Sequence, residues 1–145
     1  MAVTLSLGLS LTPWGKLPLY PLESWPEQMK RAAIKPLVPL SALDAVDIRV
    51  GTIVSVEDVL NSRKLVRLIV DFGDHQRCII AGIKTERSNP KEIEGKQSLF
   101  VVNLEPRPIM GEVSEGMLFD IGYADGETPC LAVPERAVPN GVRAG

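Results

Sequence analysis

Residues 48–56 read Ile-Arg-Val-Gly-Thr-Ile-Val-Ser-Val, a run of β-branched residues interrupted by Gly51. Such a run is typical of a strand, and a glycine inside it often marks a bulge or a sharp bend. Two further apolar runs follow at 65–72 and 77–83, and the turn residues Gly-Asp-His-Gln at 73–76 separate them. The three runs therefore predict a curled meander of three strands.

The next segment predicts one short helix and then the remaining strands. Asn89, Pro90 and Glu92 stand where a helix has its N-cap, its first-turn proline and its third residue, and Gly95 follows as a stop. Further strands are expected at 99–104 and 117–121, with a short last one at 130–133. Five curled strands with a helix between the third and the fourth are typical of an OB-type barrel. We therefore expect an all-β fold, a five-stranded OB-fold barrel with short helices and an N-terminal extension.

The composition changes near residue 40, because half of the twelve prolines and both tryptophans precede it. Strict alternation of apolar and polar residues over 3–11 predicts a half-buried strand, and Ser-Trp-Pro-Glu at 24–27 has capping-box spacing that predicts a helix over about 25–34. We expect a Pro-rich extension over 1–40, whose strand adds to a sheet edge of this subunit or of another, and a domain over 41–145. The alternative for the extension is a disordered tail.

Composition limits the classes of function. The 145 residues suggest one globular domain, and a net charge of −2 gives no support for non-specific nucleic-acid binding, so any such binding needs a local patch. The two cysteines, Cys78 and Cys130, match neither a redox pair nor a zinc motif and indicate a reducing cytoplasm. No apolar run is long enough for a membrane span and no signal peptide is recognisable, so we expect a cytoplasmic protein without a membrane partner.

Catalytic residues are not identifiable. His75 is the single histidine, lies in a predicted turn and has no patterned nucleophile beside it, so a structural or solvent role is expected. Carboxylates such as Glu112 and Glu115 are spaced like surface charges, and metal binding would need more of them with a histidine or cysteine. No phosphate-binding glycine motif is present. We therefore expect no enzyme, no metal and no cofactor.

Aromatic and cationic residues bear on nucleic-acid binding in opposite directions. Phe72, Phe100 and Phe119 lie among aliphatic residues in strand runs, so we expect core packing for them and not the stacking of bases that a generic single-strand binder needs. Six cations flank the second and third strands, which could align them along a phosphate backbone: Arg63, Lys64, Arg67, Arg77, Lys84 and Arg87. A solvated face is the alternative.

An ordered set of short motifs runs through residues 43–143. They are Asp-Ile-Arg-Val-Gly at 47–51, Lys-Leu at 64–65, Val-Asp-Phe-Gly at 70–73, Ala-Gly-Ile at 81–83, Gly-Lys at 95–96, Asn-Leu-x-Pro-Arg at 103–107 and Met-Gly-x-x-Ser-x-Gly-Met at 110–117. In this the chain resembles the tRNA-binding OB-domain family. That family includes free-standing bacterial tRNA-binding proteins, the C-terminal domain of methionyl-tRNA synthetase and an export-chaperone branch.

The resemblance implies a homodimer that recognises the shape of folded tRNA, mostly by backbone contacts, without catalysis, and that can have an aminoacyl-tRNA synthetase as partner. The implied RNA-binding residues are Lys64, Arg77 and Arg107 on phosphates, Asn103 and Ser114 on ribose or base edges, and Met117, with Arg63, Arg67 and Lys84 as further cations. Structural roles stay open for three of them, since Asn103 could cap a strand end, Ser114 could hold its loop and Met117 could pack the barrel.

Two features favour other functions. Residues 105–145 carry three cations and seven carboxylates, a balance of −4 that should weaken RNA affinity. Asp-Phe-Gly at 71–73 and Val-Pro-Asn-Gly at 138–141 resemble the export-chaperone branch, whose members would present an apolar groove to unfolded peptide. A dimerisation or docking module that uses the strand at 3–11 is the third alternative.

Overall fold

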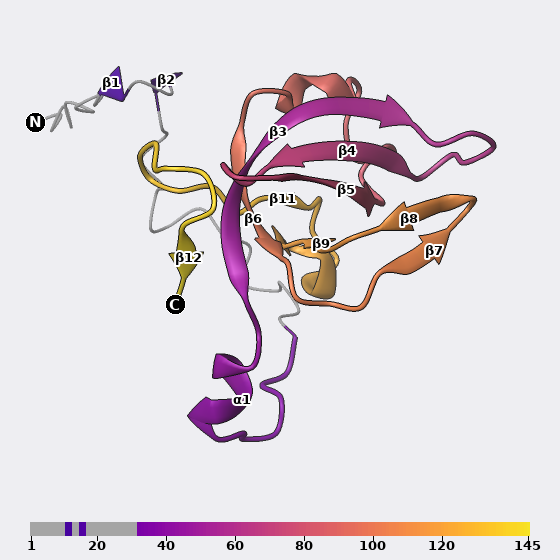
Figure 1. Cartoon of the computed structure of the whole chain (residues 1–145). Helices are drawn as coiled ribbons and strands as arrows, with labels where there is room; N and C mark the ends of the chain where they lie inside the picture. Colours follow the sequence, from indigo (N-terminus) through magenta and orange to yellow (C-terminus); the bar gives the residue numbers. More distant parts are fainter. Residues whose placement is uncertain (1–10, 13–14, 17–31) are drawn as a thin grey trace, which may run out of the picture.

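The structure of the protein, a computed structural model, describes residues 11–12, 15–16 and 32–145 (Figure 1). Of the strand expected over 3–11, only Leu11 is described, in a two-residue strand β1 (Leu11–Thr12) that pairs with β2 (Gly15–Lys16). Of the helix expected over 25–34, only residues 32–34 are described, and they are not helical. The rest of both predictions lies outside the described residues.

The main sheet is antiparallel and built around one long strand. β3 (Ile48–Asp58) pairs with β6 (Gln97–Val101) through its first half and with β4 (Val66–Asp71) through its second half. β5 (Gln76–Ala81) and β9 (Met117–Leu118) form the two ends, giving the order β5-β4-β3-β6-β9, and the short β12 (Arg143–Ala144) pairs with the start of β3. The sheet is strongly curled in Figure 1, which confirms the predicted OB-type barrel.

The bend in β3 has a local cause. A Cβ on Gly51 would lie 2.5 Å from Cγ1 of Val70 and 2.9 Å from the Phe72 ring, so only glycine allows β4 to cross this closely. The register with β4 then shifts between Ile53 and Ser55. A shift of this kind increases local twist and lets one strand belong to both halves of the barrel.

The core lies inside the curl of this sheet. Alternate residues of β4 are buried, and the core includes fully buried Ile53, Leu68, Ile79 and Phe100. The Phe72 and Phe100 rings meet edge to face, with centroids 5.7 Å apart. The sequence prediction holds for these two aromatic residues, but it was wrong for Phe119, which is 41% exposed and lies at the break between β9 and β10.

The smaller elements are α1 (Leu40–Asp44), the 3₁₀ turns η1 (Pro90–Ile93) and η2 (Tyr123–Asp125), and the hairpins β7 (Arg107–Ile109) with β8 (Glu112–Ser114) and β10 (Asp120–Ile121) with β11 (Cys130–Leu131). The predicted Asn89 cap is confirmed, since its side chain accepts a hydrogen bond from the Lys91 amide.

Two predictions need correction. The strand expected over 117–121 is broken into β9 and β10, and residues 107–114 form a hairpin that the sequence analysis missed. No helix in the described part of the chain is long and apolar enough to cross a membrane.

Candidate nucleic-acid interface

The edge of β5 opposite β4 is covered by Ser114 and Glu115, through both side-chain and backbone hydrogen bonds. The amide of Ile80 donates to Oγ of Ser114 at 3.0 Å, and the amide of Cys78 donates to a carboxylate oxygen of Glu115 at 2.9 Å. The Glu115 amide in turn donates to the Cys78 carbonyl at 2.8 Å. The segment that follows β8 is thereby fastened along β5, so the residues of the β7–β8 hairpin lie beside that strand.

Five of the predicted RNA-binding residues gather around this junction. Arg77 lies on the face of β5 that is turned toward the core, and it lines a pocket of about 180 Å³ together with Asn103. Asn103 follows β6 in the chain. Met117 stands opposite Val101 in the register of β6 and β9, and Arg107 stands opposite Ser114 in the β7–β8 hairpin. Residues far apart in the sequence thus meet on one edge of the barrel.

Three more predicted cations lie together at the far end of β5. Arg63 and Lys64 belong to the turn between β3 and β4, and the Lys84 amide donates to the Lys64 carbonyl at 3.1 Å. Lys84 is neutralised by Asp58, whose carboxylate lies 3.1 Å from Nζ. Arg63 and Lys64 are exposed and pair with no described carboxylate. In Figure 1 this turn and the tip of the β7–β8 hairpin project toward the same side of the molecule.

Arg67 does not belong to this edge. Strand alternation places it on the outer face of β4, opposite Ile80, and its guanidinium lies 3.6 Å from the Glu57 carboxylate. Arg77 stands opposite Val70, on the inner face of the same two strands. The six cations that flank β4 and β5 in sequence therefore do not form one aligned row, because Arg67 and Arg77 lie on opposite faces. Arg87 is paired as well, with the Glu92 carboxylate at 2.7 Å.

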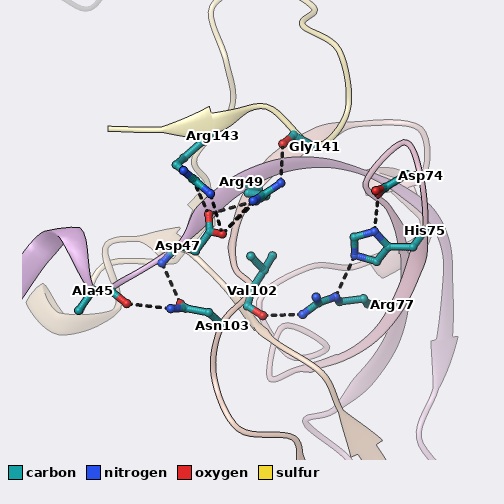
Figure 2. Close-up of polar contacts among 10 residues, drawn as sticks. All are labelled: Ala45, Asp47, Arg49, Asp74, His75, Arg77, Val102, Asn103, Gly141 and Arg143. Carbon is teal, nitrogen blue, oxygen red and sulfur yellow. Dashed lines mark hydrogen bonds and ion pairs between the residues drawn. The ribbon is translucent and has the colours of Figure 1, made fainter.

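Two of the polar residues predicted to contact RNA, Asn103 and Ser114, form hydrogen bonds with the protein's own backbone. Asn103 accepts from the Asp47 amide at 2.8 Å and donates to the Ala45 carbonyl at 2.7 Å, so it ties the end of β6 to the segment before β3 (Figure 2). The Ser114 side chain is buried, and its hydroxyl accepts from Ile80 and donates to the Gly116 carbonyl at 3.0 Å. The structural alternatives considered for both residues match these contacts.

An ion-pair cluster that the sequence analysis did not assign lies next to Asn103. The Asp47 carboxylate receives Arg49 at 3.0 Å and Arg143 at 3.1 Å, from the two strands β3 and β12 (Figure 2). The hydrogen bonds from Arg49 and then Arg143 lower the pKa of Asp47, against a smaller opposing effect of burial. The spacing of Asp47 and Arg49 was visible in the sequence, but Arg143 is distant in the chain and carried no signal.

Acidic, histidine and cysteine side chains are the remaining groups to place. No three histidine, cysteine or acidic side chains in the part of the chain that the structure describes are grouped so as to hold a metal ion. Cys78 and Cys130 are both free thiols, and burial raises the pKa of the Cys78 thiol. The features that stand out are therefore the exposed cations Arg63, Lys64 and Arg107 and the partly exposed Arg77 along one barrel edge.

Comparison with known proteins identifies the domain. The family model described as "Putative tRNA binding domain" matches residues 48–143, which include β3, β4, β5, β6 and β9 of the curled sheet and the β7–β8 hairpin. The chain belongs to this tRNA-binding domain family. The match starts at the first residue of β3 and ends at the first residue of β12.

Individual relatives agree with the family assignment. The chain is 35% identical over 111 residues to a methionine-tRNA ligase of Methanocaldococcus jannaschii, which covers 77% of this chain and 17% of the ligase. It spans only 14–17% of the length of the methionine-tRNA ligases that it matches. Among solved structures, a MetRS-related protein from Pyrococcus horikoshii matches with a TM-score of 0.71 and 33% identity, over 77% of this chain and all of that one. The chaperone CsaA from Bacillus anthracis matches with a TM-score of 0.65 and 27% identity, over 76% of this chain and all of that one.

Proposed function

We propose that this protein binds folded tRNA through the edge of β5 and catalyses no reaction on it. The observation that carries the proposal is the line of cations along that edge in a member of a tRNA-binding family. Arg77 stands near the start of β5, and Lys64 lies beyond its end. Arg107 lies on β7, opposite the Ser114 of β8 that accepts from Ile80 near the end of β5. Arg77 and Ala81 are four residue steps apart on this strand, which at about 3.3 Å per step is about 13 Å. The line is long enough to contact several phosphates.

The proposed mode of recognition depends on which side-chain groups are still available to contact RNA. Asn103 and Ser114 form their hydrogen bonds with the backbone of the protein. Phe72 and Phe100 are buried and offer no ring for base stacking, while the exposed rings of Phe119 and Tyr123 belong to the segment after β9 and not to β5. Arg107 and Lys64 are exposed and unpaired among the described residues. Phosphate contacts set the position of an RNA without reading its bases, so we expect recognition by shape and backbone.

The salt dependence of binding tests the proposal. Purified protein is titrated with folded total tRNA at about 50–300 mM salt, and three phosphate contacts predict a slope of log K against log salt of about −2 to −3. Binding at low salt with this slope supports the proposal. No binding at the lowest salt would refute it, and a slope near zero would refute the part played by phosphate contacts.

A peptide-binding function is the second candidate, because a CsaA chaperone is among the structural neighbours. The same protein is therefore offered a chemically unfolded, labelled polypeptide at the same salt concentrations. We expect no saturable binding, since the β5 edge is lined by cations and closed by Ser114 and Glu115. Saturable binding of the polypeptide with no binding of tRNA would select the chaperone alternative.

A second copy of the chain is the proposed partner at α1. This helix has five residues and none is buried, with Leu40 74% and Leu43 55% exposed. So short a helix is not stable without packing. Beside it lies a pocket of about 880 Å³ that the start of β3, Leu99 and the C-terminal residues also line. Two such faces would cover each other about a twofold axis.

The dimer is tested by mass in solution. Leu43→Glu should convert a dimer to a monomer in sedimentation, and Leu60→Glu, which changes a still more exposed leucine in the distant β3–β4 turn, should not. A wild-type monomer at micromolar concentration would refute this part of the proposal.

The remaining assignments follow from the same function. We propose that residues 41–145 form the tRNA-binding domain, that residues 1–40 are an extension to it, and that the protein works in the cytoplasm, where tRNA is used. The matched segment is a small part of each methionine-tRNA ligase, so an association with a synthetase is a proposal for this chain. Co-sedimentation of the protein with purified methionyl-tRNA synthetase tests that partner.

A further inference from the structure

His75 is the single histidine of the chain and is fixed from both sides (Figure 2). Its Nδ1 lies 2.5 Å from Oδ1 of Asp74, and its Nε2 accepts a hydrogen bond at 3.1 Å from Nε of Arg77. Because an arginine can only donate, Nε2 carries no proton, and the proton of the neutral ring is on Nδ1, directed at Asp74. The ring also stacks on Phe72, with centroids 5.5 Å apart and an interplanar angle of 25°.

Arg77 is held by three acceptors at once. Besides His75, the carbonyl oxygens of Val102 and Glu115 both accept from Nη1. No described residue accepts from Nη2. The guanidinium is therefore held through Nε and Nη1, and its remaining nitrogen is available to an acceptor from outside, such as a phosphate oxygen.

We propose that neutral His75 positions Arg77 for contact with the RNA backbone and makes that contact sensitive to pH. This inference rests on the proposed function, since it concerns the same edge of β5. A protonated ring would place an N–H at Nε2, where Nε–H of Arg77 already points, so the hydrogen bond would be replaced by two facing donors and two positive charges. Arg77 then loses one of its three anchors.

The charges around His75 do not restore the lost bond. Asp74, on the same turn, holds the imidazolium through the other nitrogen and is 88% exposed. Arg49 of β3 and Asp47, the residue before β3, line the same pocket, and Arg143 of β12 pairs with Asp47. None of these groups is an acceptor placed between His75 and Arg77 in the described contacts, so protonation separates the two side chains.

Two measurements across about pH 5.5–7.5 test the inference. An NMR titration follows the Nε–H signal of Arg77 in the free protein, and binding of folded tRNA is measured at the same pH values. We expect the Arg77 signal to shift with the titration of His75, and tRNA affinity to fall roughly 3–10-fold toward acid, as for the loss of one hydrogen bond. No other histidine contributes in this range, because the chain has none.

The variants separate positioning from a merely structural role. His75→Gln keeps an acceptor that does not titrate, so it should bind tRNA at pH 7.5 within about twofold of wild type and lose the pH dependence. His75→Ala should be roughly 3–10-fold weaker at pH 7.5 and also independent of pH. Arg136→Glu, a change at an exposed arginine paired with its neighbour Glu135, should keep the wild-type pH profile.

Each contrary outcome has its own meaning. An Arg77 signal that does not follow His75 overturns the inference whatever tRNA does. Binding of tRNA that is independent of pH, or that strengthens toward acid, overturns it while the proposed function stands. Absence of tRNA binding at every pH refutes the proposed function, and the NMR titration then still decides whether His75 controls Arg77.

Discussion

Replacing Ser114 by alanine distinguishes a structural residue from an RNA contact. The hydroxyl is on a side chain only 4% exposed, and it connects the Ile80 amide of β5 to the Gly116 carbonyl that precedes β9. Ser114→Ala removes both bonds and leaves a buried amide without an acceptor, which costs about 1–3 kcal/mol. We expect the free energy of unfolding to fall by about 2 kcal/mol and the Tm by roughly 6–10 °C.

The assay is urea unfolding followed by circular dichroism, with tRNA binding measured at a temperature where the variant is folded. Ser88→Ala is the matched control, because Ser88 is exposed and makes no hydrogen bond to a described residue, and its stability should stay within about 0.5 kcal/mol of wild type. The affinity of Ser114→Ala for tRNA should stay within about threefold of wild type. Unchanged stability together with a tenfold or greater loss of affinity would refute the reasoning and return the hydroxyl to the RNA.

Further predictions concern the bend, the hairpin turn, the acid limb of stability and the extension. Gly51→Ala should lower the free energy of unfolding by about 1–3 kcal/mol in urea titrations, since its Cβ would overlap Val70, and an unchanged midpoint would contradict the close crossing. Met110 has a φ of 51° beside Gly111 in a two-residue turn, a conformation that asparagine adopts more easily. Met110→Asn should therefore raise the free energy of unfolding by about 0.5–1 kcal/mol and the Tm with it, and a lower Tm would contradict the turn type. Folding lowers the pKa of Asp47, so its ion pairs stabilise the protein above about pH 4 and this stabilisation is lost as the pH falls further. Asp47→Asn should therefore lower the free energy of unfolding at pH 7, and the difference from wild type should shrink below about pH 4, as measured by acid unfolding. Removal of residues 1–31 should leave tRNA affinity unchanged, and a tenfold loss would assign those residues to the site.

The strands and the site differ in how far sequence alone can predict them. β3, β4 and β5 follow from alternating β-branched residues, because a half-buried strand needs nothing else to be recognisable. Phe100 and Phe119 lie in similar local sequence, yet Phe100 is fully buried and Phe119 is 41% exposed, because the chain after β9 leaves the main sheet to form the β10–β11 hairpin. Burial of that kind is a tertiary property.

The candidate site shows the same division. The sequence shows that Lys64, Arg77 and Arg107 are cations near predicted strands. Which cations share an edge depends on the strand register, which places Arg77 opposite Val70 and Arg67 opposite Ile80. Asn103 and Ser114 have polar groups of the right type for RNA, and their partners within the chain, Ala45 and Ile80, lie at least 34 positions away. Such contacts leave no local pattern in the sequence.

Charge reversal on the β5 edge tests the central claim most directly. Lys64→Glu/Arg107→Glu changes two exposed residues whose side chains form no hydrogen bond or ion pair with the described chain, so the circular dichroism spectrum of the folded protein should be unchanged. We predict that the affinity for folded tRNA at about 50 mM salt falls roughly a hundredfold, which is about 2.7 kcal/mol, while Arg136→Glu stays within about threefold of wild type. Wild-type affinity in the folded double variant would contradict the claim that this edge binds tRNA.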